Sequence, residues 1–172
     1  MSLSNNTKNA LAKAMKTLMV RQSFTKISVG DICDECGLNR KSFYYHFKDK
    51  YDLVNWIFQT EFLEMLKVHT YSSSWQLILD ICVYLYSEKE FYSNALQYEG
   101  QNSFRGYFSS TIGAILLVLM NENMRNIEDS RFFVTFTTDA ILAAIIRWLT
   151  ESPSTKPEEF VGKLQNAIRA ML

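Results

Sequence analysis

Proline is almost absent from this chain, and both copies lie near its end, at Pro153 and Pro157. Because proline removes an amide donor and breaks helix interiors, its absence from the first 152 positions permits long helices. Apolar residues recur at helical spacing, as Leu11, Ala14 and Leu18 show, and no stretch alternates polar and apolar residues as a half-buried strand does. We therefore predict an all-α protein.

The predicted helices number about nine, and the first three form an N-terminal head on a helical-bundle body. They cover residues 7–21, 29–36, 40–47, 50–68, 75–86, 88–98, 102–124, 129–151 and 157–171. With 48% hydrophobic and 21% charged residues, the chain can bury a core. The net charge is zero, but residues 1–50 hold nine Lys and Arg against four Asp and Glu. A basic head on an acidic body points to a polyanionic partner at the head.

Capping residues divide residues 28–47 into two short helices joined by a tight turn. Ser28, with Asp31 three positions later, is a helix start of the capping-box type. Gly37 suits a left-handed helix end, and Asn39 is a good N-cap for the next helix. This spacing is typical of a helix-turn-helix, whose second helix enters the major groove of DNA.

The second of these helices presents a cationic and phenolic face once its apolar residues are placed inward. Setting Phe43 and Phe47 toward the core puts Lys41 and Tyr45 on the opposite side, at 100° per residue. The remaining polar residues flank this face or lie in the first turn, namely Arg40, Ser42 and Tyr44. Such side chains bond phosphates and base edges, so we expect Arg40, Lys41 and Ser42 to read bases.

Residues about 10–58 resemble the DNA-binding head of the tetracycline-repressor (TetR) family of regulators. The resemblance is carried by the strings FTKISVGDI at 24–32, GLNRKSFYYHF at 37–47 and KDKYDL at 48–53. It implies phosphate contacts for Ser28, Tyr44, His46 and Lys50. It also implies base contacts for the positions of Arg40, Lys41 and Ser42, although a small residue is common in the family where Lys41 stands. Two alternatives stay open, a solvated surface role for Lys50 and a packing or capping role for His46.

Cys33 and Cys36 form a CxxC pair that invites a zinc or redox interpretation. Tetrahedral zinc needs two further ligands, and the sequence has no second CxxC and no close histidine pair. Both cysteines occupy core-facing positions of their helix, so we expect packing, no metal and no cofactor, and a redox switch stays open as the alternative. With no phosphate-cradling glycine loop and only His46 and His69 for acid–base work, we do not expect an enzyme.

The body is expected to form a homodimer, because one helix-turn-helix contacts too little DNA for strong specificity. Small and apolar residues of the last two helices are the predicted interface: Ala140, Ala143, Ala144, Trp148, Leu164 and Ile168. Aromatic residues of the middle helices are the predicted effector pocket: Phe91, Tyr92, Tyr98, Phe104, Tyr107 and Phe108. Both sets can equally be ordinary core, since apolar residues at helical spacing usually pack inside a subunit.

The body also resembles, more loosely, a TetR subgroup that includes the activator of the dihydroxyacetone-kinase operon. The similarity rests on Phe91-Tyr92 after Glu88-Lys89-Glu90 and on Trp148. In that subgroup's activator a protein partner brings the signal, so a small molecule or a protein is an admissible effector here.

Together these features predict a regulator with a DNA-binding domain at 1–50 and an effector and dimerisation domain at 51–172. We expect a repressor on a palindromic operator. The alternatives are an activator under a protein partner, or a ligand-binding or adaptor protein whose head has lost DNA affinity. The polar N-terminus and three cysteines suggest the bacterial cytoplasm, at the nucleoid when DNA-bound, and the apolar run 112–120 is too short to span a membrane.

Overall fold

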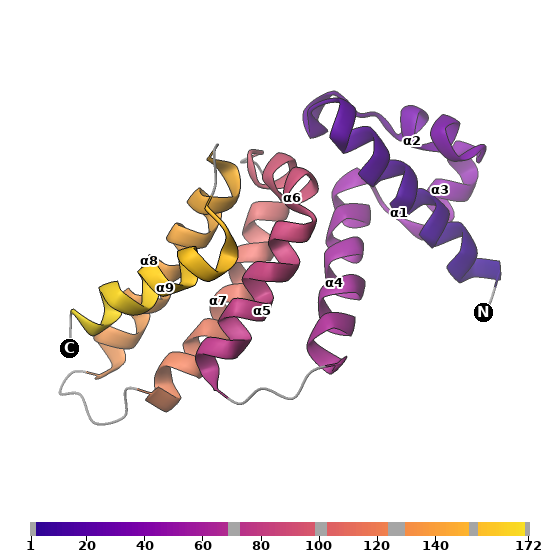
Figure 1. The fold of residues 1–172 in the computed structure, drawn as a ribbon. Coiled ribbons are helices and arrows are strands. Elements are labelled where there is room, and N and C mark those ends of the chain that lie inside the picture. Colours follow the sequence, from indigo (N-terminus) through magenta and orange to yellow (C-terminus); the bar gives the residue numbers. More distant parts are fainter. Residues whose placement is uncertain (1–2, 69–72, 99–102, 124–129, 152–154, 171–172) are drawn as a thin grey trace. The chain divides into compact units, whose positions relative to one another are not determined.

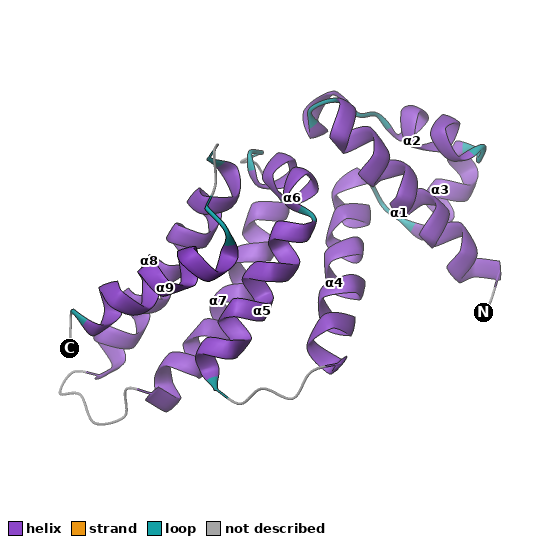
Figure 2. Ribbon diagram, in the orientation of Figure 1, coloured by secondary structure: helices purple, strands orange, loops and turns teal. Residues whose placement is uncertain are grey.

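The computed structural model describes residues 3–68, 73–98, 103–123, 130–151 and 155–170. Within these ranges every regular element is a helix (Figures 1 and 2). The elements are α1 (Leu3–Arg21), η1 (Phe24–Lys26, a 3₁₀ helix), α2 (Val29–Cys36), α3 (Arg40–His46), α4 (Lys50–Val68), α5 (Ser74–Ser87), α6 (Lys89–Leu96), α7 (Phe104–Asn123), α8 (Ser130–Thr150) and α9 (Pro157–Arg169). The predicted all-α class and the predicted order of helices are confirmed.

The helix ends differ from the predicted ones by a few residues where no capping signal marks them. Helix α1 begins at Leu3 rather than at residue 7, and α6 ends at Leu96 rather than at residue 98. The segment between α1 and α2, where no helix was predicted, contains η1. Three residues are too few to show a hydrophobic period, so this element has no signature in the sequence.

The chain packs as two compact units that alternate along the sequence. The first unit joins Met1–His69 to Glu90–Arg105, and so holds α1 to α4, η1 and nearly all of α6. The second joins Thr70–Lys89 to Gly106–Leu172, and holds α5, most of α7, α8 and α9. A functional boundary at residue 50 stays a prediction, but α4 and α6 pack with the head.

In the first unit, α1 packs against α2, α3 and α4, and α2 packs against α3. The residues at the centre of this packing have no exposed surface: Leu11, Met15, Ile32, Phe43, Leu53 and Ile57. They come from every helix of the helix-turn-helix and its two neighbours, so the motif is fixed by one shared core. Removing such apolar area from water is the main stabilising contribution in a domain of this kind.

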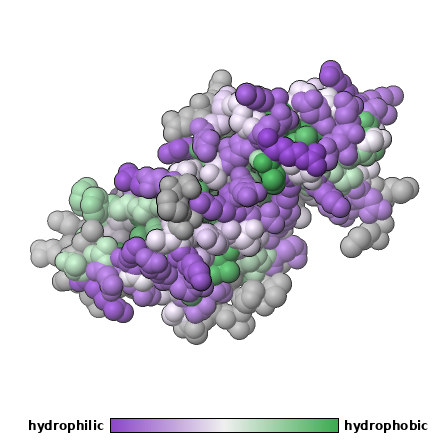
Figure 3. Space-filling model, turned by 45° about the horizontal axis from the view of Figure 1, so that its top comes forward, coloured by the Kyte–Doolittle hydropathy of each residue, from purple (hydrophilic) through white to green (hydrophobic). Residues whose placement is uncertain are grey.

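In the second unit, α5 lies against α8 and α9. Its buried core includes Ile78, Cys82, Leu85, Ile145, Leu149 and Val161. Residues Arg131–Thr150 of α8 contain an 18-residue window with a mean hydropathy of 1.6, and by length and composition only they are long and apolar enough to cross a membrane. Yet 44% of that window is buried in the unit, as in the core helix of a soluble protein, so this one helix is weak evidence for a span. Figure 3 shows a mostly hydrophilic face on which apolar residues gather in separate patches.

Candidate nucleic-acid interface

Helix α2 is bounded by the two signals that its sequence carries. The Ser28 hydroxyl accepts a hydrogen bond from the Asp31 amide at 3.2 Å, and the Asp31 carboxylate accepts one from the Ser28 amide at 2.8 Å. This capping box satisfies amides that a helix start leaves without partners. Gly37 ends the helix with a φ of 67°, which glycine adopts at little cost. Both predicted caps are confirmed.

Helix α3 is anchored as its sequence predicts. The Asn39 side-chain oxygen accepts hydrogen bonds from the amide and the hydroxyl of Ser42, at 2.8 and 3.1 Å, and so caps the helix. Phe43 is fully buried, and Phe47 is 3% exposed. Their ring centroids lie 5.9 Å apart, and the ring of Phe47 also contacts Trp56 of α4. The predicted inward anchors of α3 are confirmed.

The opposite face of α3 is open to solvent. Tyr45 is 81% exposed and Tyr44 is 58% exposed, and Arg40 and Lys41 are exposed beside them. Two tyrosines held in water next to two cations form a surface that suits phosphate and base contacts. The predicted orientation of α3 is confirmed, whereas contact of these side chains with DNA stays a prediction.

A hollow of about 310 Å³ lies beside α3, where α1 passes it. It is lined by Thr7, Asn39, Lys41, Ser42, Tyr45 and His46. Four of these residues are predicted DNA contacts, so the fold brings them together. His46 is half-buried, and its ring meets that of Tyr45 edge-on at 4.9 Å. Thr7 joins the site through packing of α1, for which the sequence offers no local signal.

Two hydroxyls predicted to contact DNA are engaged inside the protein. The Ser28 hydroxyl donates to the Asp31 carboxylate at 2.8 Å, and the Ser42 hydroxyl donates to Asn39 at 3.1 Å. A hydroxyl has one proton to donate, so neither can donate to a phosphate while these bonds last. Each hydroxyl keeps a lone pair that can accept from a base amino group, but a phosphate oxygen has no proton to donate to it. The arrangement therefore fits the predicted base contact of Ser42 better than the predicted phosphate contact of Ser28.

Lys50 differs most from its predicted role. Its ammonium donates to the backbone carbonyls of Phe24, Thr25 and Ile27, at 2.8, 3.2 and 2.7 Å. An ammonium has three protons, so all of them are bonded within the protein. Burial also lowers the pKa of Lys50, against the opposing effect of Asp31. In this structure Lys50 therefore holds η1 in place, and its contact with a phosphate stays a prediction that requires at least one of these bonds to break.

The CxxC pair packs inside the helix-turn-helix. Cys33 is 1% exposed, and Cys36 is half-buried with its thiol bonded to the carbonyl of Ile32. Burial raises the pKa of both thiols, so they stay protonated at neutral pH and are poor nucleophiles and metal ligands. The described residues contain no group of three or more His, Cys, Asp or Glu that could hold a metal ion.

Two family models match the chain and together cover both parts of it. Residues 10–57 match the model of bacterial regulatory proteins of the tetR family, and residues 73–170 match a transcriptional regulator C-terminal region of the same family. The second match alone spans more than half of the chain. The chain belongs to the TetR family. It is a transcriptional regulator of a family that binds DNA and dimerises, and whose members are regulators rather than enzymes.

Relatives of this TetR-family chain include an activator. Over 70 residues it is 34% identical to the HTH-type dhaKLM operon transcriptional activator DhaS of Lactococcus lactis subsp. lactis (strain IL1403). That match covers 41% of this chain and 37% of the activator, so it spans little more than a third of the relative's length. The expected resemblance to the family and to the subgroup of that activator is confirmed.

Solved structures of the family share the fold. They include the dihydroxyacetone kinase operon activator DhaS, with a TM-score of 0.73 and 23% identity over 96% of this chain and 95% of the other. A TetR regulator from Streptococcus agalactiae 2603V has a TM-score of 0.75 and 17% identity, over 96% and 94%. NalD, the secondary repressor of the MexAB-OprM multidrug efflux pump in Pseudomonas aeruginosa, has a TM-score of 0.71 and 17% identity, over 98% of this chain and 96% of NalD. At such identities the likeness shows the fold alone.

The aromatic residues predicted to line an effector pocket are mostly core. Phe91, Tyr92, Phe104 and Phe108 are at most 2% exposed, and Tyr98 and Tyr107 are half-buried. Rings of Tyr92 and Phe104 both meet that of Phe58, at centroid distances of 6.0 and 5.5 Å. A pocket formed by these residues stays a prediction, and a ligand there would have to displace ring contacts.

The residues predicted to form a dimer interface divide into two groups. Ala140 and Ala143 are exposed, and Ala144 and Leu164 are half-buried. Trp148 and Ile168, in contrast, are 6% and 7% exposed and belong to the core of the second unit.

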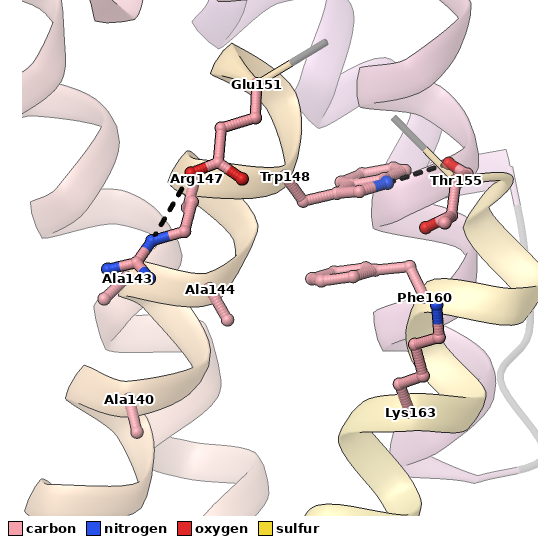
Figure 4. A pocket seen from close by; sticks show the side chains of 9 residues that line it. All are labelled: Ala140, Ala143, Ala144, Arg147, Trp148, Glu151, Thr155, Phe160 and Lys163. Atoms are coloured by element: carbon pink, nitrogen blue, oxygen red, sulfur yellow. Dashed lines mark hydrogen bonds and ion pairs between the residues drawn. The ribbon is translucent and has the colours of Figure 1, made fainter. Parts of the chain in front are cut away.

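Trp148 is fixed by contacts inside its own unit. Its ring stacks on Phe160 at 4.5 Å, and its indole nitrogen donates to the Thr155 carbonyl at 2.8 Å (Figure 4). The same ring also stacks on Tyr86 of α5 at 5.6 Å. Beside it a groove of about 450 Å³ runs along α8 and α9. The groove is lined by Ala140, Ala143, Ala144, Arg147, Trp148, Glu151, Thr155, Phe160 and Lys163. Trp148 thus forms a wall of this groove and offers little surface to a partner.

Proposed function

We propose that this regulator reads a palindromic DNA operator with α3, acting as a homodimer. The observation that carries the proposal is the exposure of Tyr44 and Tyr45, at 58% and 81%, beside the exposed cations Arg40 and Lys41. Buried Phe43 and Phe47 hold this face outward. Arg40, Lys41 and Ser42 in the first turn are the proposed base contacts, because helix N-terminal residues reach deepest into the major groove.

Tyr44, Tyr45 and His46 are the proposed phosphate contacts. The hollow beside α3 supports this assignment, because Lys41 and Tyr45 line it together with His46. A phosphate oxygen in that hollow would meet a cation and a phenol at once, and charge-assisted hydrogen bonds of this kind are the stronger ones. Residues 1–50 are the proposed DNA-binding domain, acting on the nucleoid in the bacterial cytoplasm.

The dimer we propose joins two copies through the outer face of α8 and its groove with α9. Phe132 and Phe136 on α8 are 75% and 50% exposed and stack on each other, and Ala140 and Ala143 continue the same face. Large apolar side chains in water next to small ones that admit a partner helix are typical of an association surface. A two-fold axis makes such a face its own complement. Residues 51–172 are the proposed dimerisation and effector domain.

Repression is the proposed output, because a bound dimer blocks an overlapping promoter without any further contact. Activation, the output named for the Lactococcus lactis relative, needs a second contact with the transcription machinery. Run-off transcription from a promoter that carries the selected operator separates the two. A fall in transcript on adding the protein supports repression, and a rise supports an activator under a protein effector.

In vitro selection from random DNA tests the proposal directly. We expect a palindromic product, with half-sites about one helical turn apart. Affinity for that product should fall steeply with salt, because bound phosphates release counterions. A protein that enriches no sequence would instead be a ligand-binding or adaptor protein whose head has lost DNA affinity.

Substitutions in α3 then assign roles to single residues. Lys41→Ala should relax base preference at one position of the site, at a cost of about 1–3 kcal/mol. Tyr45→Phe should weaken binding to all sequences alike, by about 1 kcal/mol, because it removes one hydrogen bond. Lys156→Ala, an exposed cation of the second unit, is the control. If both α3 variants bind the selected site as wild type does, α3 is not the recognition helix.

A further inference from the structure

Helix α6 belongs to the head by packing, although the sequence places it inside the body. The segment Glu90–Arg105 lies in the first unit, and the segments of the chain on either side of it, Thr70–Lys89 and Gly106–Leu172, form the second. Only Glu88 separates the end of α5 from the start of α6.

One side chain of α6 joins that helix to the end of α1. The Asn94 amide nitrogen donates to the carbonyls of Met19 and Gln22, at 2.9 and 2.8 Å, and the Asn94 oxygen accepts from the Phe24 amide at 2.8 Å. The last carbonyls of a helix have no partner within it. Asn94 supplies partners to the end of α1 from more than 70 residues further along the chain, and its hydrogen-bonding capacity is nearly filled by doing so.

A second contact lies one turn further along the same segment. The Tyr98 ring lies 5.3 Å from that of Tyr51 on α4 and 6.3 Å from that of Phe24. A hydrogen bond with the Tyr98 side chain contributes most to raising the pKa of Tyr51 to about 12, so the Tyr51 phenol stays neutral in the physiological range. The segment that carries Asn94 therefore touches α1, η1 and α4 together.

Phe24 is held from both sides at the point where the helix-turn-helix begins. Its amide donates to Asn94, and its carbonyl accepts from Lys50. Only Ile27 separates η1 from Ser28, the N-cap of α2. Fixing the Phe24 backbone therefore fixes where α2 starts, and α2 in turn packs against α3.

We infer that Asn94 is a positioning residue for operator recognition, which fixes the start of the helix-turn-helix by bonding the end of α1 and the backbone of η1. The inference rests on the proposed function, because it concerns the placement of α3 on DNA. Coupling between the Asn94 contact and operator binding is reciprocal: if the state of that contact alters operator affinity, the operator stabilises the contact.

The test compares Asn94→Leu and Asn94→Asp with wild type and with Asn166→Leu, a control at an exposed position of α9. Operator dissociation constants are measured at a temperature where circular dichroism shows every variant folded. We expect Asn94→Leu to bind about tenfold more weakly, equivalent to about 1.4 kcal/mol. Asn94→Asp should regain affinity as pH falls from 8 to 5, because protonation restores one donor toward the α1 carbonyls. The control should bind as wild type does.

Amide hydrogen exchange at Phe24 supplies a second readout. It should be faster in Asn94→Leu, and adding operator should slow it in wild type much more than in the variant. A purely structural role predicts a lower melting temperature with unchanged operator affinity of the folded protein, and that result would overturn the inference. If wild type itself binds no selected DNA, the proposed function fails first, which is a distinguishable result.

Discussion

The ammonium of Lys50 is the clearest case of a single side chain that stabilises the head. It holds the backbone of η1 and of the residue that follows it, through the carbonyls of Phe24, Thr25 and Ile27. It also lies 4.6 Å from the centre of the Phe24 ring, within cation–π distance. Lys50→Met keeps the aliphatic stem and removes all of these contacts. We expect a loss of about 2 kcal/mol in the free energy of unfolding, the order found for hydrogen bonds to charged groups.

Urea unfolding of the Lys50→Met variant measures that loss. Lys48→Met, at an exposed position two residues earlier, is the matched control and should leave the urea midpoint unchanged. The alternative role, a phosphate clamp, predicts the reverse pattern: unchanged stability with a shallower dependence of operator affinity on salt. A stable Lys50→Met protein with a flattened salt slope would restore Lys50 to the DNA interface.

Acid should weaken the start of α2 through Asp31. Hydrogen bonds lower the pKa of this carboxyl, first the one from the Ser28 amide and then the one from the Ser28 hydroxyl. Because the folded-state pKa lies below the unfolded value of about 3.9, its contribution to stability is present above that value. The contribution is lost as pH falls through the folded-state pKa. We expect Asp31→Asn to be less stable than wild type at pH 7, and the difference in urea midpoint to shrink below about pH 4. A difference that persists at pH 3 would show that the charge of Asp31 is not its cause.

At the scale of helices, the sequence predicts best those features that depend on interactions within a few residues along the chain. Ser28, Gly37 and Asn39 were predicted as caps because each acts on backbone groups within three or four residues. Phe43 and Phe47 were predicted as anchors from the helical period alone. The bonds of Lys50 to the backbone could not be predicted, since its partners lie 23 to 26 residues away. The Asn94 contact was missed for the same reason, because a long-range hydrogen bond leaves no pattern along the chain.

The position of the Arg40 guanidinium depends on the absence of a side chain at Gly30. A Cβ built there would lie 2.6 Å from a terminal nitrogen of Arg40 and 3.4 Å from the Ser28 hydroxyl. The guanidinium is the far end of a flexible side chain, so Gly30→Ala should move Arg40 rather than the backbone. We expect unchanged or slightly higher stability, since alanine favours helix, and a base preference relaxed by about 1–3 kcal/mol at the position that Arg40 reads.

Gly37→Ala is the opposite case and serves as the comparison. A Cβ built at Gly37 would meet no neighbouring group within 4 Å, but the φ of 67° at this position is strained for most other residues. We expect this variant to lose about 1 kcal/mol of stability while keeping the base preference. Selection from random DNA and thermal unfolding, applied to both variants, separate the two effects. Equal base preference in wild type and Gly30→Ala would exclude Arg40 as a base contact.

At the scale of the whole molecule, the division into two units could not be predicted from composition or charge. The change from a basic to an acidic chain near residue 50 suggested a boundary there, yet α4 and α6 pack with the head. The nearly continuous apolar run of α8 likewise has no clear helical period, so the sequence does not show which of its residues face inward. Trp148 was predicted as interface, but its stacking on Phe160 and Tyr86 makes it core, a pairing set by tertiary packing.

The exposed face of α8 leads to the prediction that tests the proposed homodimer. Ala143 is exposed and lines the groove along α8 and α9, so Ala143→Glu adds a carboxylate without disturbing the core. Across a two-fold axis each copy would place this larger, charged side chain where small alanines admit the partner helix, and burying a charge there is costly. We expect the variant to elute as a monomer in size-exclusion chromatography. Its free energy of unfolding should lie within about 0.5 kcal/mol of that of the wild-type monomer, because surface substitutions change the free energy of unfolding little.

Val83→Glu is the matched control, since Val83 is an apolar residue of the same unit that is 43% exposed and lies outside the groove. It should remain a dimer and bind the operator as wild type does. Ala143→Glu should bind the full palindrome no better than a single half-site, because two heads no longer act on one DNA molecule. A dimeric Ala143→Glu protein with full affinity for the palindrome would place the interface elsewhere on the body.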